Sequence, residues 1–403
     1  MGRLTWAAAG LALVGLSCQG KAQEVRQDVA LRDLVRQLTP GIERATGLRF
    51  KTPPKLARRT RAQVRDYLLH QFDADIPPAE FAARELAYKL FGLVPDSLDL
   101  REALLAVLAE QIAGYYDPDS ATLFIVADVD SFALRTTLSH ELAHALQHQY
   151  IPLDSLLKQK NQNDRTMAAK AMLEGQATLA QTLAMMPELK REDLPSFWDQ
   201  RVVLYQQQTR MKEFAHAPLF LREWLVFPYL GGADFVRWYE QGHPGQHPYG
   251  SALPLSTEQI LHPDRYAAGD VPTQLAFTGK SPDSVRVEDD LGEFEIRLLF
   301  QQRLNDPTGL RATALAAGWD GDRYELLGKG GAGAALVWYS VWDDQAAADR
   351  FRRSLERAWI GGKAGRTVRI EAVSIGDRPG VRLVDAPAAW YGWRALPSVK
   401  IVP

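Results

Sequence analysis

The 403-residue sequence contains a single cysteine, Cys18, so the chain lacks a pair that can form an internal disulfide. It also lacks a strong excess of either charge, because 47 lysines and arginines stand against 49 aspartates and glutamates. Proteins that bind nucleic acids usually show a basic excess, so no nucleic-acid partner is expected. The local basic run from Lys55 to Arg65 is interpreted as a solvated helix face.

Long hydrophobic runs are missing beyond the N-terminus. Leu4 to Leu16 is apolar, follows the positive Arg3 and has the length of a signal-peptide core, which is too short to span a bilayer. Gly20-Lys21-Ala22 offers small residues for ordinary cleavage, whereas Cys18 resembles the lipidated cysteine of a bacterial lipoprotein signal. With either ending, we expect residues 1–22 to be a signal peptide. The protein is then exported to the periplasm or cell envelope, or secreted, and contacts a membrane only through a lipid on Cys18.

Apolar residues at three-to-four spacing predict helices over most of residues 25–108 and again over 134–149 and 166–186. Asp117-Pro118-Asp119-Ser120 predicts a turn, and the β-branched, apolar Thr122–Val126 predicts a hairpin or an edge strand.

The C-terminal part of the sequence changes character. Residues 251–304 are predicted to form a loop-rich linker and a helix. Strand-like segments and one amphipathic helix then predict a small α+β domain over residues 305–403. Five aromatic residues of this domain are interpreted as core and not as a binding platform: Trp319, Tyr324, Trp338, Tyr339 and Trp342.

The segment "TTLSHELAHALQHQY" contains the pattern HExxH, formed by His140, Glu141 and His144. Residues four apart on a helix lie about 40° apart around the axis and about 6 Å along it, so both imidazoles can bind one ion. Glu141 lies about 100° from His140, where it can take a proton from a metal-bound water. Zinc accepts imidazole ligands and lowers the pKa of its bound water towards about 7. We therefore expect one zinc ion per chain, with Glu141 as general base.

His148 belongs to the same segment but cannot reach the same ion. It lies about 12 Å along the helix axis from His140 and about 80° around it. The metzincin pattern HExxHxxGxxH would need glycine in place of Gln147 and histidine in place of Tyr150. His148 is therefore predicted to support the site or to lie on the surface.

A catalytic zinc site usually has three protein ligands, so one more is needed. Glu174 is the best candidate, because it stands in the Ala- and Leu-rich stretch "AKAMLEGQATLAQ", where an unpaired charge is costly. Gly175 would allow that helix to pack closely against the motif helix. Asp154 and Asp164 are weaker alternatives, since they lie in polar or loop surroundings.

HExxH on one helix followed by an "EGxA" segment on the next resembles the gluzincin class of zinc metallopeptidases over residues 112 to 180. The wider pattern "GYYDPDSATLFIV…TLSHELAHALQHQY…AMLEGQAT", with "STEQILHP" and "GWDGDRYELL", resembles predicted bacterial metallopeptidases of the cell envelope across most of the chain. This resemblance implies His140, His144 and Glu174 as zinc ligands and Glu141 as general base.

One position departs from the resemblance. Thermolysin-like members carry an aspartate four residues after the ligand glutamate, where this chain has Thr178, so another residue such as Asp154 must support the ligands. Zincins also bind peptides along an edge strand, for which Thr122–Val126 is the candidate. Candidates for stabilising the oxyanion are Tyr116, His262 and Tyr266.

Together these patterns predict an α+β protein with a mainly helical, zincin-like catalytic domain over residues 23–250 that contains a small antiparallel sheet. The predicted activity is zinc-dependent hydrolysis of peptide bonds in a peptide or protein substrate. Two alternatives stay open: a non-catalytic binding or assembly protein of the cell envelope on the same scaffold, and a zinc hydrolase of non-protein amides. The sequence indicates neither the cleavage preference nor the oligomeric state.

Overall fold

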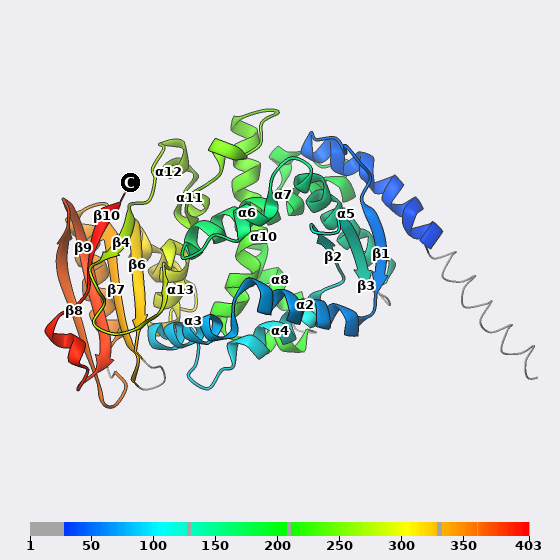
Figure 1. Cartoon of the computed structure of the whole chain (residues 1–403). Coiled ribbons are helices and arrows are strands. Elements are labelled where there is room, and N and C mark those ends of the chain that lie inside the picture. Colours follow the sequence, from blue (N-terminus) through cyan, green and yellow to red (C-terminus); the bar gives the residue numbers. More distant parts are fainter. Residues whose placement is uncertain (1–27, 127–129, 208–210, 329–332, 361, 403) are drawn as a thin grey trace, which may run out of the picture.

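The computed structural model describes residues 28–126, 130–207, 211–328, 333–360 and 362–402. These residues have an α+β fold, in which a mainly helical region with a small sheet precedes a five-stranded antiparallel sheet (Figure 1). The predicted α+β class is thus confirmed. No helix within these ranges is long and apolar enough to cross a membrane. The predicted signal peptide, with Cys18 and Gly20-Lys21-Ala22, lies outside the described residues.

The first region begins with a helix over residues 28–46. It continues with β1 (Lys55–Arg59), α2 (Arg61–Asp75), α3 (Pro78–Phe91), α4 (Leu100–Gln111), β2 (Gly114–Asp117), β3 (Thr122–Val126), α5 (Ser131–His148), α6 (Leu153–Leu157), α7 (Asn163–Met185), α8 (Arg201–Gln207), α9 (Lys212–His216), α10 (Leu219–Gly242), α11 (Thr257–Leu261) and α12 (Pro263–Ala267). The second region contains β4 (Gln274–Thr278), β5 (Val285–Asp289), α13 (Gly292–Arg303), α14 (Leu310–Ala316), β6 (Trp319–Leu327), β7 (Ala335–Trp342), α15 (Gln345–Ala358), β8 (Arg366–Ile375), β9 (Arg378–Pro387) and β10 (Ser398–Val402).

The small sheet has the strand order β1-β3-β2. β2 and β3 form the predicted hairpin, and β1 pairs in parallel with the other side of β3, with Lys55 opposite Thr122. The expectation that Thr122–Val126 is an edge strand is therefore wrong. A strand more than sixty residues earlier in the chain covers it, and the edges of this sheet are β1 and β2.

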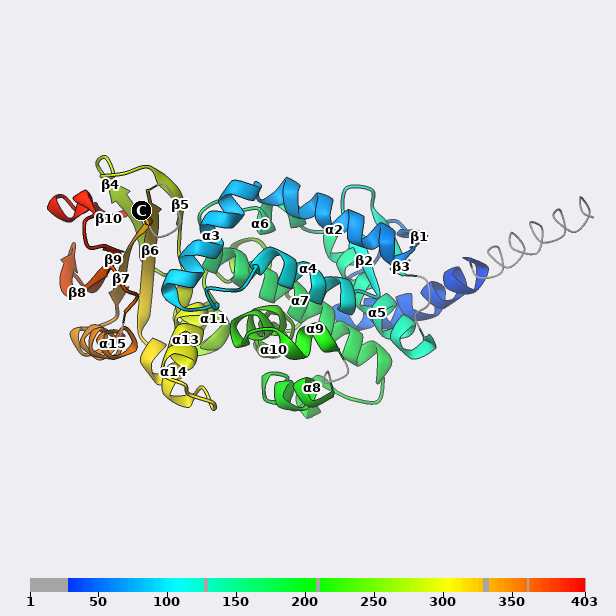
Figure 2. The same cartoon turned by 90° about the horizontal axis from the view of Figure 1, so that it is seen from below.

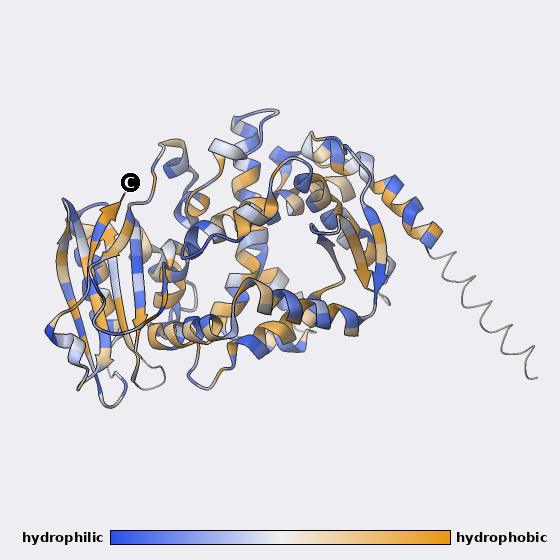
Figure 3. Ribbon diagram, viewed as in Figure 1, coloured by the Kyte–Doolittle hydropathy of each residue, from blue (hydrophilic) through white to orange (hydrophobic). Residues whose placement is uncertain are grey.

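The HExxH helix α5 packs in a hydrophobic core that also includes residues of the small sheet. Leu138, Leu142 and Leu146 of α5 are fully buried and cluster with one side of the helix over residues 28–46. That helix alternates hydrophobic and hydrophilic residues, as Figure 3 shows. The carboxylate of Asp130 caps the start of α5 by accepting hydrogen bonds from the backbone N–H groups of Phe132 and Ala133.

α7 crosses α10 at a contact between two glycines. A Cβ atom on Gly232 would lie 1.8 Å from the carbonyl oxygen of Ala171, and one on Gly175 would lie 2.0 Å from the carbonyl carbon of Gly232. Only glycine permits this approach of the two backbones. Gly175 does allow close packing, but its partner is α10 and not the motif helix α5, which corrects the sequence-based expectation.

The second region is built on a sheet with the order β5-β6-β7-β9-β8, and β4 pairs separately with β10. The sheet begins at Val285, inside the segment expected to be linker and helix, because β5 pairs with β6. α15 packs against β7, β8 and β9. The five aromatic residues assigned to the core are all buried, which confirms that interpretation: Trp319, Tyr324, Trp338, Tyr339 and Trp342.

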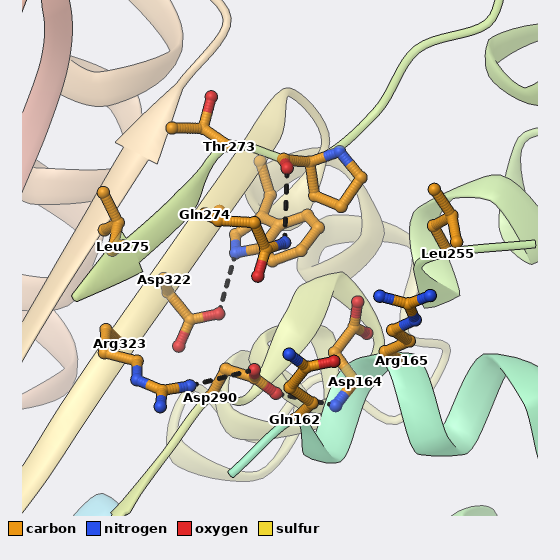
Figure 4. Close-up of a pocket in the computed structure, with 13 residues that line it drawn as sticks. Gln162, Asp164, Arg165, Leu255, Thr273, Gln274, Leu275, Asp290, Asp322 and Arg323 are labelled. Carbon is orange, nitrogen blue, oxygen red and sulfur yellow. Dashed lines mark hydrogen bonds and ion pairs between the residues drawn. The ribbon is translucent and has the colours of Figure 1, made fainter. Parts of the chain in front are cut away.

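The N-terminal end of α7 docks on the second region beside a cavity of about 20 Å³, which has room for about one water molecule (Figure 4). The backbone N–H of Asp164 donates to Asp290 at 2.7 Å, and Asp290 lies 3.6 Å from the guanidinium of Arg323. The Asp164 carboxylate accepts a hydrogen bond from the backbone N–H of Thr257 at 3.1 Å. These contacts fix the start of α7 relative to α11 and β6.

Asp322 on β6 holds the other wall of this junction. It accepts hydrogen bonds from the backbone N–H groups of Leu291 and Gly292, both at 2.9 Å, and from the indoles of Trp319 and Trp338 at 3.0 and 2.8 Å. Four donors satisfy the buried carboxylate of Asp322, which therefore has a structural role at the junction.

We expect Gly232→Ala to lower the free energy of unfolding by about 1–3 kcal/mol, because the new methyl group overpacks the α7–α10 crossing. Gly242→Ala, at the end of the same helix, meets nothing within 4 Å and is the matched control. It is expected to be neutral or stabilising by up to about 1 kcal/mol. Chemical denaturation measures both; equal effects of the two substitutions would contradict the crossing as described.

Candidate metal centre

Two helices bring three potential metal ligands together. α5 supplies His140 and His144, and α7, which lies beside it in both views (Figures 1 and 2), supplies Glu174. The two Nε2 atoms are 3.0 Å apart, and the Glu174 Oε2 atom lies 3.1 Å from His140 Nε2 and 3.2 Å from His144 Nε2. Among the described residues, this is the one group of three or more such side chains with the spacing of a metal site.

The spacing of these donor atoms fits zinc. Ligand atoms about 2.0–2.1 Å from a tetrahedral zinc ion lie about 3.3 Å from one another, close to the distances seen here. Two imidazoles and one carboxylate are also a ligand set found in catalytic zinc sites. The three side chains are largely buried but retain some exposure: 11% for His140 and 16% each for His144 and Glu174.

The electrostatics of the cluster favour a cation. Burial lowers the pKa of His144, but the combined effects of Glu174, Glu141 and Gln147 outweigh it and raise this pKa to about 9. Burial raises the pKa of Glu174, but the two histidines outweigh it and hold this pKa well below its ordinary value. A carboxylate that attracts a proton this strongly to neighbouring imidazoles attracts a metal ion at the same place, in competition with the proton.

Gln147 fixes the orientation of the His144 ring. Its Nε2 group donates to the backbone carbonyl of Leu173 at 2.9 Å, and a carbonyl can only accept. The Gln147 Oε1 atom therefore faces His144 Nδ1, 2.9 Å away, and accepts its hydrogen. With Nδ1 protonated, Nε2 is the atom of His144 that is available to a metal.

A second amide extends this support away from the ligands. Gln147 Nε2 also donates to Gln176 Oε1 at 3.0 Å, and the Tyr249 hydroxyl donates to the same oxygen. The Gln176 Nε2 group lies 3.4 Å from His247 Nδ1. Both glutamines are about 1% exposed, so water cannot compete effectively for these bonds.

The sequence did not settle which residue supports the metal ligands, and Gln147 and Gln176 bear on that point. The thermolysin-like aspartate is replaced by Thr178, and Asp154 was the suggested substitute. The Asp154 side chain lies outside the described part of the structure. Gln147, three residues after His144 on the same helix, supports that ligand, and the i, i+3 spacing is the one sequence signal that points to it.

Glu141 lies beside the ligand cluster and accepts a hydrogen bond from the backbone N–H of Tyr116 at 2.8 Å. Burial raises its pKa above the ordinary value, although the two histidines and the Tyr116 amide act in the opposite direction. Because the Tyr116 amide points at Glu141 and away from β3, the side of β2 that pairs with no strand faces the motif helix. β2, and not Thr122–Val126, is the edge strand next to the site.

His148 does not join the cluster, as its spacing predicted. Its Nδ1 atom lies 2.8 Å from the hydroxyl of Tyr116, so one residue of β2 contacts α5 through both its backbone and its side chain. This pair ties β2 to the last turn of the motif helix.

The structure places two of the three expected oxyanion candidates away from the cluster. His262 Nε2 lies 2.9 Å from Glu293 Oε1, and the Tyr266 hydroxyl donates to the carbonyl of Ala252 at 2.7 Å. Both residues belong to the α11–α12 segment, which Figure 1 shows apart from α5. Asp164, the weaker ligand candidate, is ten residues before Glu174, or about 15 Å along α7, and is used at the junction.

Tyr229 is a site residue that the sequence analysis missed. Its ring stacks on His140 with centroids 5.6 Å apart and an interplanar angle of 26°. Burial, the charges of Glu174 and Glu141, and a hydrogen bond with Glu174 raise its pKa well above the ordinary value, so its hydroxyl stays neutral. Tyr229 lies on α10, 55 positions after Glu174 and next to the buried Pro228, where no spacing relates it to the HExxH motif.

Comparison with known proteins covers only the second region. A family model described as a domain of unknown function (DUF8575) matches residues 283–385, which run from β5 into β9 and include none of the clustered ligands. No curated protein matches the chain. No solved structure matches it either. The resemblance to gluzincins therefore stays a prediction, and the function has to be argued from the site.

We expect Gln147→Ala to weaken zinc binding by about 10- to 100-fold, because His144 loses the acceptor that orients its ring. Competition titration against a zinc-chelating dye measures the affinity. Gln345→Ala, at an exposed position at the start of α15, is the control and should bind zinc like the wild type. Unchanged affinity in Gln147→Ala would show that the amide does not support the ligand.

Proposed function

We propose that the protein is an exported zinc-dependent metallopeptidase. The observation that carries this proposal is the convergence of His140 Nε2, His144 Nε2 and Glu174 Oε2 within 3.2 Å of one another. Glu141 is buried beside them and is not one of the three converging ligands. Three protein ligands with a further coordination position left open are typical of catalytic zinc sites. A carboxylate next to them is the usual general base.

His140, His144 and Glu174 would hold the zinc ion, which supplies the positive charge that acidifies a water molecule and polarises a carbonyl group. Glu141 would accept a proton from the attacking water and return it to the leaving amine. Its raised pKa suits both transfers, since a base that is too weakly basic would not hold the proton. The neutral hydroxyl of Tyr229, next to Glu174, can donate a hydrogen bond to the developing oxyanion.

The edge strand β2 supports a peptide as the substrate. It pairs with β3 on one side, and the Tyr116 amide on its other side points at Glu141. Because Glu141 already accepts from the Tyr116 amide, an extended peptide that adds to this edge would use the other outward main-chain groups of β2, whatever its side chains are. A substrate without an extended backbone would make no use of this edge.

Glu141→Gln is expected to lower the hydrolysis of a quenched-fluorescent peptide mixture by about 100-fold or more, because it removes the proton acceptor. Its zinc content should equal that of the wild type, since Glu141 is not one of the ligands. The measurements are the initial rate of the zinc-loaded protein and metal analysis of the same samples.

Glu102→Gln, an exposed glutamate at the start of α4, is the matched control and should leave the rate unchanged. Full activity in Glu141→Gln would exclude Glu141 as the general base. A zinc-loaded wild type that cleaves no peptide would contradict the proposal and favour a binding protein. Cleavage of small non-peptide amides alone would favour the other hydrolase.

A further inference from the structure

Lys170 lies on α7 one helical turn before Glu174. Residues four apart share one face of a helix, about 6 Å apart along its axis, so Lys170 lies on the side of α7 that carries the ligand. Its side chain is half-buried, as are those of Trp224 and Tyr229 on the facing helix α10. These three residues and the ligand cluster therefore occupy neighbouring turns of the same two helices.

The ammonium group of Lys170 contacts an aromatic ring and has no polar partner among the described residues. Its Nζ atom lies 5.1 Å from the centroid of the Trp224 ring. No hydrogen bond or ion pair joins it to any part of the chain that the structure describes, although an ammonium group carries three N–H donors. An aromatic face attracts a cation but accepts no more than one of these donors.

The charge of Lys170 interacts with that of Glu174 in the ligand cluster. Burial lowers the pKa of its ammonium group, and the negative charge of Glu174 counteracts this effect. The positive charge is thus within electrostatic range of the ligands without being neutralised by an ion pair. The next basic residue towards the start of α7, Arg165, lines the junction cavity instead.

The Lys170 Nζ atom is not fully buried, so its N–H groups can meet water or the polar group of a ligand. A peptide cleaved at the clustered ligands would pass near Lys170, which lies one helical turn, about 6 Å, from Glu174 along α7. A carboxylate is the group of a peptide that an ammonium binds best, through short charge-assisted hydrogen bonds.

We propose that Lys170 binds a carboxylate of the peptide substrate next to the cleaved bond, so that the enzyme prefers peptides carrying a carboxylate at that position. This inference rests on the proposed peptidase function and deepens it. The carboxylate belongs either to the C-terminus of the substrate or to an acidic side chain, and the two sources are separated by the probes.

The test uses three peptide hydroxamates that share one sequence and bind zinc through the hydroxamate. The first ends in a free carboxylate, the second in a carboxamide, and the third in a carboxamide with a glutamate as the last residue. Isothermal titration calorimetry on the zinc-loaded full chain should show that the first or the third probe binds about 10-fold more tightly than the neutral second one. Which of the two gains affinity identifies the source of the carboxylate.

Lys170→Met should abolish this preference and Lys170→Arg should retain part of it, with zinc content and melting temperature checked for each variant. Lys212→Met, at an exposed position on α9, is the matched control and should keep the full preference. Equal binding of all three probes by the wild type, or a preference that survives in Lys170→Met, would overturn this inference alone. Binding of no probe by protein shown to contain zinc would overturn the inference and the proposed function together.

Discussion

The close approach of α5 and α7 is the constraint on which the rest of the molecule depends. It brings two imidazole nitrogens and one carboxylate oxygen within 3.2 Å of one another in a largely buried place. Such an arrangement concentrates negative charge and lone pairs, and it is stable only when a proton or a metal ion lies among them. The raised pKa of His144 and the lowered pKa of Glu174 express the same requirement.

Two features far from the ligands in the sequence hold α7 in the position that this approach needs. At its start, Asp164 is bonded to Asp290 and Thr257, so the helix is anchored to the second region. In its middle, Gly175 meets Gly232 of α10, and that crossing also brings Tyr229 to His140. The second region thus contributes to the site by positioning α7, although it supplies none of the clustered side chains.

The set of residues that converge at the site was largely predictable from local sequence, because its strongest signals are short-range. HExxH on a helix fixes the relative placement of His140 and His144 by helix geometry alone. Glu174 stood out because a charged residue in an Ala- and Leu-rich helix needs a partner, and the cluster contains that partner. The role of each residue in catalysis remains a proposal, but the set that converges is the set that the spacing indicated.

The parts that escaped prediction depend on long-range contacts. Thr122–Val126 has the composition of an edge strand, and no neighbouring residue in the sequence indicates that β1 pairs with it. Gly175 indicates a close approach but does not identify α10 as the partner. Tyr229 lies in an apolar helix, where an aromatic residue needs no special explanation. Local sequence patterns do not indicate which distant helices pack against each other.

The most direct measurement is the zinc content of the purified protein, determined by mass spectrometry for the wild type and for Glu174→Ala. The account predicts one zinc ion per chain in the wild type and a large loss in the variant, because a site of two histidines binds zinc far more weakly than one of three ligands. A wild type that holds no zinc even after reconstitution, or a variant that holds as much as the wild type, would contradict it.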